Sequence, residues 1–348
     1  MKNFTALQKT ILSVLAAVVI GVFLAVASLP VPISAVRHGR LHPDETFRLE
    51  AHRGGRDERP ENTIMAYEHA MKMGATVVEC DMQMTGDGHI VMSHNPTLDA
   101  DMARDASGAY VARDAHDLRR MTLDEIRVYD VGTPRADSDY EKAHVTEGYV
   151  SGSTKIPTLD EMFALADAGG YDSVKFDVET KSFPDPSSGY LYKYNPDPER
   201  FVNEFYRVVK EHHMERRVTL QSFDWRTIAA MKSIDASVEC AALWSPGIER
   251  ATDGEGRSYQ LAGIRFIDFM KDPIIAAHEI GADIFSSNAA YLTHGRVREA
   301  HLLGMPVLAW TVNDEKTMER LIDMGVDGII TDRPLLLKSV LDRRGIEY

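Results

Sequence analysis

Two acidic residues, Glu79 and Asp81, flank Cys80 in an apolar run that is typical of a buried β-strand. Because side chains alternate across a strand, both carboxylates lie on one face about 7 Å apart, and they repel each other unless a positive group lies between them. Carboxylates without a neighbouring Cys or His favour a hard cation over zinc. We therefore expect one divalent cation here, Ca²⁺ or Mg²⁺, although a solvated surface pair would show the same spacing.

A second run, residues 174–181, alternates strictly between apolar and charged residues. Its charged members share one face and are Lys175, Asp177, Glu179 and Lys181. If the apolar face packs against helices, the charged face enters the interior, where charges are costly unless they pair or meet a ligand. We expect Lys175 and Asp177, which lie deeper in the barrel, to belong to an interior ladder of ion pairs. Glu179, near the strand end, would join the two carboxylates of the preceding strand.

Two histidines, His52 and His94, stand at the ends of predicted strands. Imidazole exchanges a proton near neutral pH, and Arg53, next to His52, can clamp a phosphate. One such histidine would more often be structural. Two of them, together with an arginine, a lysine and three carboxylates, indicate a reactive site. The nearby segment 61–63 also fits the start of a helix, with Asn62 or Thr63 as its N-cap.

Eight short runs rich in Val, Ile and Phe alternate with amphipathic stretches from residue 47 onward. The predicted strands are 47–52, 77–84, 173–180, 218–222, 239–244, 283–287, 306–311 and 328–331. Eight strand–helix units fit a closed barrel better than an open sheet, and no G-x-G-x-x-G motif follows the first strand. We therefore predict an α/β fold, a TIM (β/α)8 barrel.

Three turn-rich stretches interrupt this alternation, at residues 96–157, 183–197 and 245–271. All follow strands, so we expect them to be insertions at the C-terminal mouth of the barrel, where active sites are built. The second contains Tyr190, Tyr192 and Tyr194. These tyrosines could line the side of the site that holds a leaving group, or could belong to a partly solvated loop.

Residues 1–36 form a separate N-terminal hydrophobic segment. Its apolar run, residues 11–29, follows Lys2 and Lys9 and is long enough to cross a bilayer. Two interpretations stay open: a signal peptide processed near Ala27, or an uncleaved transmembrane anchor with its lysines in the cytoplasm. Either one exports the domain predicted at residues 37–348, which would be anchored facing the periplasm or another extracytoplasmic space, or soluble in the periplasm.

Charge and cysteine content exclude other classes of protein. The chain has 39 Lys and Arg against 53 Asp and Glu, a formal charge of −14. A protein that tracks nucleic acid needs a basic stripe, so we expect no nucleic-acid partner. Two cysteines, Cys80 and Cys240, are too few for a disulfide framework or a Cys-rich metal site.

Seven motifs occur in the order found in a known family of hydrolases. They are His52-Arg53-Gly54, Glu61-Asn62-Thr63, Glu79-x-Asp81, His94 with Pro96-Thr97-Leu98, Glu179-x-Lys181, Ala309-Trp310-Thr311-Val312-Asn313 and 328–334, Gly-Ile-Ile-Thr-Asp-Arg-Pro. The chain thereby resembles the glycerophosphodiester phosphodiesterase family. The resemblance implies a TIM barrel that uses one divalent cation to hydrolyse small-molecule glycerophosphodiesters to sn-glycerol 3-phosphate and an alcohol.

The resemblance also implies a role for each residue of the site. These are metal binding for Glu79, Asp81 and Glu179, acid–base catalysis for His52 and His94, and substrate binding for Arg53, Glu61, Lys181 and Trp310. The chain departs from the family pattern at Cys80, where an aliphatic residue is usual, and at Asn95, where Asp is common. Neither residue belongs to the implied site.

Two alternatives remain at the level of sequence. One is a lysophospholipase D or sphingomyelinase D-like phosphodiesterase of the same barrel, which the membrane segment would suit. The other is a non-catalytic binding protein tethered to the membrane. The intact set of histidines and carboxylates argues against the second alternative, whereas no residue decides the first.

Overall fold

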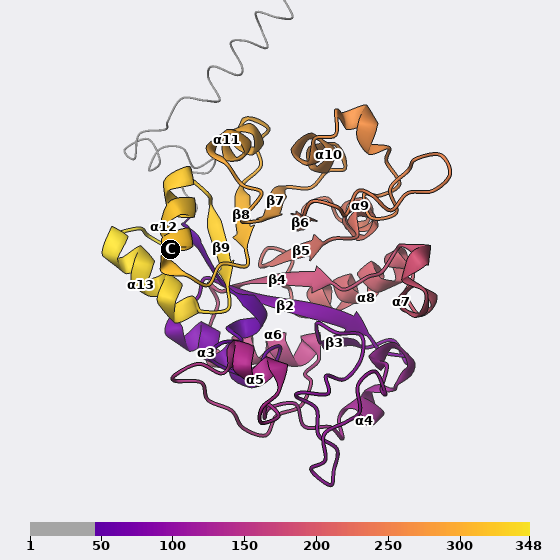
Figure 1. The fold of residues 1–348 in the computed structure, drawn as a ribbon, viewed down its shortest axis with the longest axis vertical. Coiled ribbons are helices and arrows are strands. Elements are labelled where there is room, and N and C mark those ends of the chain that lie inside the picture. Colours follow the sequence, from indigo (N-terminus) through magenta and orange to yellow (C-terminus); the bar gives the residue numbers. More distant parts are fainter. Residues whose placement is uncertain (1–45) are drawn as a thin grey trace, which may run out of the picture.

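The computed structural model describes residues 46–348, and its strands form one closed parallel barrel with an added hairpin strand (Figure 1). The strands are β1 (Arg48–Ala51), β2 (Val77–Met84), β3 (Ile90–Met92), β4 (Lys175–Thr180), β5 (Val218–Ser222), β6 (Glu239–Trp244), β7 (Ile284–Asn288), β8 (Val307–Trp310) and β9 (Gly328–Thr331). Strand β1 pairs in parallel with both β2 and β9, which closes the ring, and β3 pairs antiparallel with β2. The predicted TIM barrel is confirmed.

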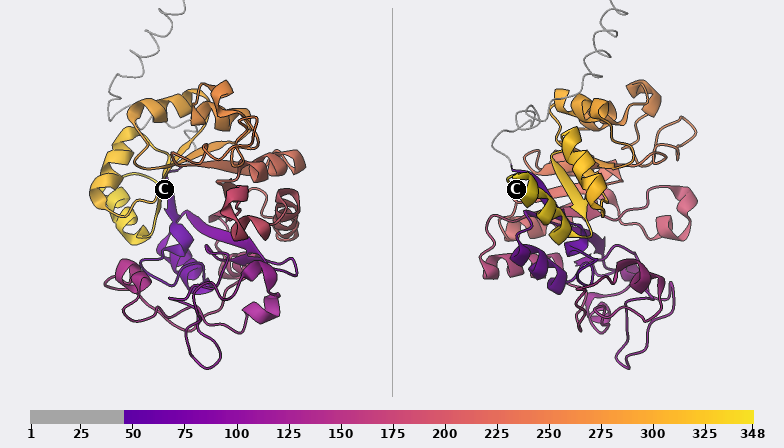
Figure 2. Two further views of the ribbon diagram at one scale, coloured as in Figure 1. Left: turned by 45° about the vertical axis from the view of Figure 1, so that its right-hand side comes forward. Right: turned by 60° about the vertical axis from the view of Figure 1, so that its left-hand side comes forward.

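Eight helices follow the barrel strands and cover the outside of the wall (Figure 2). They are α3 (Ile64–Met73), α6 (Leu159–Gly169), α8 (Pro198–Glu211), α9 (Trp225–Ile234), α10 (Pro273–Glu279), α11 (His294–Leu302), α12 (Glu315–Met324) and α13 (Pro334–Arg344). On β4 the apolar face does pack outward, since Phe176 and Phe163 of α6 stack edge to face in the buried core. This packing turns the charged face of β4 inward.

The barrel interior contains both apolar and charged side chains. Ala241, Ile284 and Leu308 form a small buried cluster. Arg48, at the start of β1, donates to both carboxylate oxygens of Glu239, at the start of β6, at 2.7 Å. The interior therefore already contains one strong ion pair near its base.

The predicted ladder of ion pairs through Lys175 and Asp177 is wrong. Among residues 46–348 neither residue forms an ion pair, and Asp177 instead lies among the carboxyl groups of Glu50 and Glu79. Burial, followed by the charges of these two neighbours, raises the pKa of Asp177 well above its usual range. Burial also raises the pKa of Glu50 to about 7. Strand alternation placed these side chains in the interior but did not identify their partners.

The three interrupting stretches are insertions that follow barrel strands or the β2–β3 hairpin, as predicted. Residues 96–157 contain η2 (Leu118–Arg120), α4 (Leu123–Ile126) and α5 (Asp139–His144); residues 183–197 contain η3 (Pro186–Ser188) and α7 (Tyr190–Lys193); residues 245–271 contain η4 (Phe266–Phe269). In Figure 1 α4 and α7 lie on the side towards which the arrows of β2 and β4 point. Parts of the first two insertions therefore lie at the mouth.

The first insertion has a hydrophobic core of its own. This small core consists of Val91, Leu98, Ala103, Val111, Leu118, Ile126 and Ile156. The second insertion packs against the first. The guanidinium group of Arg119, in the first insertion, lies over the ring of Tyr190 in the second, and that of Arg120 lies over the ring of Tyr194. Tyr190 and Tyr192 are nearly half exposed, which agrees with the interpretation as a partly solvated loop.

The N-terminal hydrophobic segment and the predicted boundary after residue 36 lie outside the described residues. Export and membrane anchoring therefore stay predictions. Within residues 46–348, no helix combines the length and the apolar character that crossing a bilayer requires.

Close packing at the start of β9 gives a test of the barrel. A Cβ on Gly328 would lie 2.6 Å from Cβ of Arg48 and 2.7 Å from Cδ2 of Leu308. Overpacking of this kind costs about 1–3 kcal/mol. We expect Gly328→Ala to lower the free energy of unfolding in urea by that amount. Gly254→Ala, where a Cβ meets nothing within 4 Å, is the control. Equal stability of the two variants would contradict this packing.

Candidate active site

His52 follows β1 at the mouth as part of η1 (His52–Gly54), and a carboxylate holds one of its ring nitrogens. Nδ1 lies 2.5 Å from Oδ1 of Asp332, which follows β9. Asn313 donates to the other oxygen of Asp332, and Nε of Arg56 lies 2.9 Å from the first. A carboxylate at Nδ1 fixes the tautomer and leaves Nε2 free for proton transfer. That Nε2 lies 4.0 Å from Oε2 of Glu79.

Glu79, Asp81 and Glu179 converge as the sequence predicted. Strands β2 and β4 pair with Asp81 opposite Glu179, so the three side chains share one face of adjacent strands. One ligand oxygen from each lies within 4.8 Å of the others, and all three residues are buried. Three buried carboxylates this close repel one another strongly.

Two cations lie against these carboxylates. Nε of Arg53 is 3.1 Å from Asp81, and its backbone N–H donates to Glu79 at 2.7 Å. Nζ of Lys181 donates to Glu179 at 2.7 Å and lies 3.4 Å from Asp81. Two positive charges against three negative ones leave the group short of neutralisation. Oδ1 of Asp81 is buried and makes no hydrogen bond within the described residues.

The pKa values of the carboxyl groups reflect this imbalance. Burial and then the charges of Asp81 and Glu179 raise the pKa of Glu79 well above its usual range. Burial also raises the pKa of Glu179 to about 7, although Lys181 opposes this shift. Burial would raise the pKa of Asp81 too, but Lys181 and Arg53 hold it well below its usual range. The donors are all oxygens, so the residues fit a hard divalent cation.

Two neutral amides fix the orientation of the carboxylates. Nδ2 of Asn62 donates to Asp81 at 2.9 Å, and its Oδ1 accepts from the Asp81 backbone N–H and the Tyr67 hydroxyl. Nε2 of Gln221, on β5, donates to Glu79 at 3.0 Å. Asn62 has a left-handed backbone with φ of 53°, directly before the N-cap Thr63 of α3. The predicted cap is therefore present, and the residue before it supports the site.

His94 lies just beyond β3, on the rim of the mouth. Its Nδ1 is 3.0 Å from Oδ1 of Asn95, and its side chain borders the same cleft as Glu61. Burial, followed by the positive charges of Lys181 and Arg53, lowers the pKa of His94 to about 3. Glu61 accepts from Arg53 at 2.8 Å.

Trp310, at the end of β8, contacts an aromatic residue that follows β5. Its ring meets Phe223 edge to face, with 5.4 Å between the ring centroids. Its Nε1 is buried and has no hydrogen-bond partner within the described residues. Its role in substrate binding stays a prediction.

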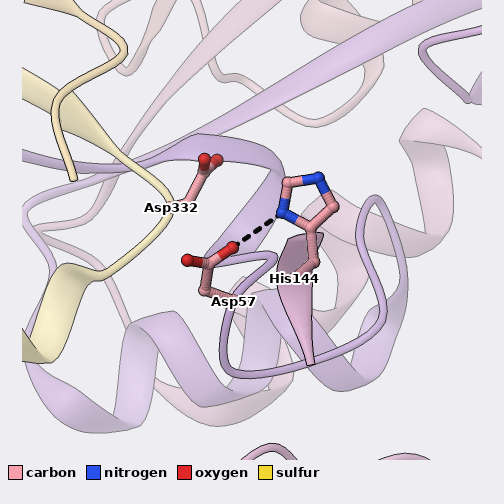
Figure 3. Close-up of side chains that lie close together, drawn as sticks. All are labelled: Asp57, His144 and Asp332. Atoms are coloured by element: carbon pink, nitrogen blue, oxygen red, sulfur yellow. Dashed lines mark hydrogen bonds and ion pairs between the residues drawn. The ribbon is translucent and has the colours of Figure 1, made fainter. Parts of the chain in front are cut away.

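A second acidic cluster lies beside the first. Figure 3 shows Asp57, His144 and Asp332 turned towards one another, with Nδ1 of His144 2.8 Å from Asp57. Guanidinium groups already occupy this cluster, because Arg333 donates to Asp57 at 2.7 Å and Arg56 contacts Asp332. The cluster therefore has its positive charge supplied by the protein, and it attaches α5 of the first insertion to the loop after β1.

Sequence reasoning assigned no part in the active site to several residues that shape it, namely Asp332, Asn313, Asn62, Arg56 and Gln221. The first three lie in the motifs that carried the family resemblance, so the signal was present without a function attached. Arg56 reaches the site because the loop after η1 turns back, and Gln221 reaches it through the register of β5. Neither feature can be seen in a local sequence pattern.

Comparison with known proteins places this geometry in a family. Two relatives, both named glycerophosphodiester phosphodiesterase, come from Caldanaerobacter subterraneus subsp. tengcongensis and Bacillus subtilis. The first is 28% identical over 85% of this chain and 98% of its own length, and the second is 29% identical over 89% of this chain and 91% of its own.

A crystal structure from Silicibacter pomeroyi, provisionally designated a glycerophosphoryl diester phosphodiesterase, has a TM-score of 0.75 and 27% identity. The alignment covers 90% of this chain and 99% of that one. A phosphodiesterase from Oleispira antarctica in complex with the product sn-glycerol-3-phosphate shares the fold, with a TM-score of 0.60 and 20% identity over 84% of this chain and 96% of that one. The profile of one family matches residues 52–336, nearly the whole barrel. The chain belongs to the glycerophosphoryl diester phosphodiesterase family.

Proposed function

We propose that this protein hydrolyses glycerophosphodiesters to sn-glycerol 3-phosphate and an alcohol. The observation that carries the proposal is the meeting of two histidines, two cations and three carboxylates at one mouth of the barrel. The names of the relatives and the product bound to the Oleispira antarctica enzyme support the same reaction.

Arg53 and Lys181 are the residues that would bind the phosphodiester. Both are largely buried, so a phosphate oxygen placed against them would be shielded from water, where each contact is strong. A bound phosphodiester anion would also offset the two charges that depress the pKa of His94.

Glu79, Asp81 and Glu179 would hold one divalent cation, Ca²⁺ or Mg²⁺. One oxygen from each lies within 4.8 Å of the others. The two neighbouring side-chain cations do not balance the negative charge of three carboxylates. When bound, such a cation supplies Lewis-acid stabilisation of charge on the phosphoryl oxygens.

The histidines divide the proton transfers between them. His52, held at Nδ1 by Asp332, would take the proton from the attacking hydroxyl, which belongs to glycerol C2 or to water. The bond between phosphorus and the alcohol oxygen then breaks. His94, on the rim, would give its proton to that oxygen, so that the alcohol leaves neutral. Attack by water gives sn-glycerol 3-phosphate directly. Attack by the glycerol C2 hydroxyl gives a cyclic phosphate, which water then opens with the two histidines in reversed roles.

Removal of the cation tests the proposed metal-binding role of the three carboxylates. We expect exhaustive EDTA treatment to abolish hydrolysis of glycerophosphocholine, and Ca²⁺ or Mg²⁺ to restore it. Glu79→Gln removes one ligand charge and should weaken restoration at a given metal concentration. Full activity after EDTA would show that the three carboxylates work without a metal.

Replacement of the histidines tests the proton transfers. We expect His52→Ala and His94→Ala each to lower kcat by about 10²–10⁴, the usual contribution of a positioned acid or base. His89→Ala is the matched control, because His89 lies half exposed in the β2–β3 hairpin, away from the carboxylates. Near-normal turnover by either site variant would assign that histidine a structural role.

Asp332 is expected to act as a positioning residue. Asp332→Asn removes the charge at Nδ1 of His52 and should lower kcat by about 10²–10⁴ while KM changes less than about threefold. Asp327→Asn is the control, since Asp327 holds a different histidine, His301, at 2.7 Å outside the site. If both variants kept kcat, the contact between Asp332 and His52 would matter only for folding.

A further inference from the structure

The loop after β1 contains two neighbouring carboxylates, and each of them holds a histidine from another part of the chain. Nδ1 of His144, on α5, lies 2.8 Å from Oδ1 of Asp57. Nε2 of His69, on α3, lies 2.6 Å from Oε2 of Glu58. The two histidine side chains are shielded to almost the same degree, with 16% and 17% exposed. Neither pair takes part in the proton transfers proposed above.

The pair of Asp57 and His144 leads on to the histidine that would accept a proton. Asp57 is buried, and its backbone N–H donates to the carbonyl of Asp332 at 3.1 Å. Its Oδ2 accepts from Nε of Arg333, the residue after Asp332, at 2.7 Å. The carboxylate of Asp332 lies 2.5 Å from Nδ1 of His52. A chain of contacts therefore runs from α5 in the first insertion to the ring of His52.

The first insertion holds Asp57 at two points. Besides the contact with His144, Oγ1 of Thr146 donates to the carbonyl of Asp57 at 2.9 Å. The ring of His144 also packs against that of Tyr140, with 4.9 Å between the ring centroids. The position of Asp57 thus depends on the first insertion as well as on the barrel.

Asp332 has to be held in place because a second carboxylate lies beside it. One ligand atom from each of Asp57, His144 and Asp332 lies within 4.8 Å of the others (Figure 3). Two buried carboxylates at this distance repel each other, although Arg333 contacts one of them and Arg56 the other. We expect a change at Asp57 to shift Asp332. A displacement of about 1 Å near the reacting atoms can lower a rate about 10²-fold.

We propose that His144 and Asp57 are positioning residues, which hold Asp332, and through it His52, in the geometry for proton transfer. The inference rests on the proposed function and gives the first insertion a part in it. Among residues 46–348 neither side chain contacts Arg53 or Lys181. Both residues would therefore act on turnover and not on substrate binding.

Removal of one donor tests this chain of contacts. His144→Phe keeps a ring against Tyr140 but cannot donate to Asp57. We expect kcat for glycerophosphocholine to fall about tenfold, while KM changes less than about twofold, because a positioning contact is lost and no binding contact is. His144→Asn has an amide N–H near the place of Nδ1, and it should restore kcat to within about threefold of the wild type.

His69→Phe is the matched control. It makes the same substitution in a histidine that is shielded to the same degree and bonded to the neighbouring carboxylate, but that pair anchors α3. Its kcat should stay within about twofold of the wild type. Equal losses of kcat in the two phenylalanine variants would indicate a general loosening of the loop and would overturn the inference.

Combination with Asp332→Asn shows whether the effect passes through Asp332. In that background His144→Phe should lower kcat by less than a further factor of about two, because the contact that it supports is already lost. A further tenfold loss would mean that the two residues act independently, which contradicts the proposed route. Thr146→Val removes the other hold on Asp57 and should lower kcat about threefold, so the test does not depend on the folding of one variant.

Wild-type turnover separates this inference from the proposed function. If the wild type does not hydrolyse glycerophosphocholine, the proposed function is wrong and the inference falls with it. If the wild type is active and the folded variants His144→Phe and Thr146→Val keep its kcat, only the positioning role is wrong. A lowered melting temperature without a change in kcat would show that these contacts serve folding alone.

Discussion

Mutual repulsion among the buried carboxylates Glu79, Asp81 and Glu179 is the constraint on which the site depends. Burying each carboxylate away from water costs free energy, and burying three together is possible only when positive groups contact them. Arg53 and Lys181 supply part of that charge and are held in place by the same contacts. The residues that would bind an anionic substrate are therefore positioned by the residues that would bind a cation.

Strand register makes this arrangement possible. Because Asp81 lies opposite Glu179, two neighbouring strands present their carboxylates at the same height in the barrel. A shift of one residue in β2 would turn Glu79 and Asp81 outward and Cys80 inward. Val78, Cys80 and Met82 alternate with these two residues along β2 and belong to the outer core, so such a shift would remove them from it. Packing on the outside of the barrel thus protects the chemistry on its inside.

Much of this was accessible from the sequence because period-two alternation is a local property. It predicted the inward face of β4 and the convergence of the three carboxylates, and the alternation of eight strands with helices predicted the barrel. The partner of Asp177 was mispredicted, since it depends on which side chains meet across the interior. The bond between His52 and Asp332 joins residues 280 apart, so no spacing rule could have revealed it.

The first insertion leaves and rejoins the barrel at almost one point. Val91 bridges to Thr158, and the N–H of Met92 donates to the carbonyl of Pro157 at 2.9 Å. Since its ends are already joined and it has a hydrophobic core of its own, changes in its length or sequence need not disturb the strands beneath. The barrel strands and their carboxylates can stay constant while this segment diverges, so the cleft that the segment forms beside His94 can change in evolution without altering the strands.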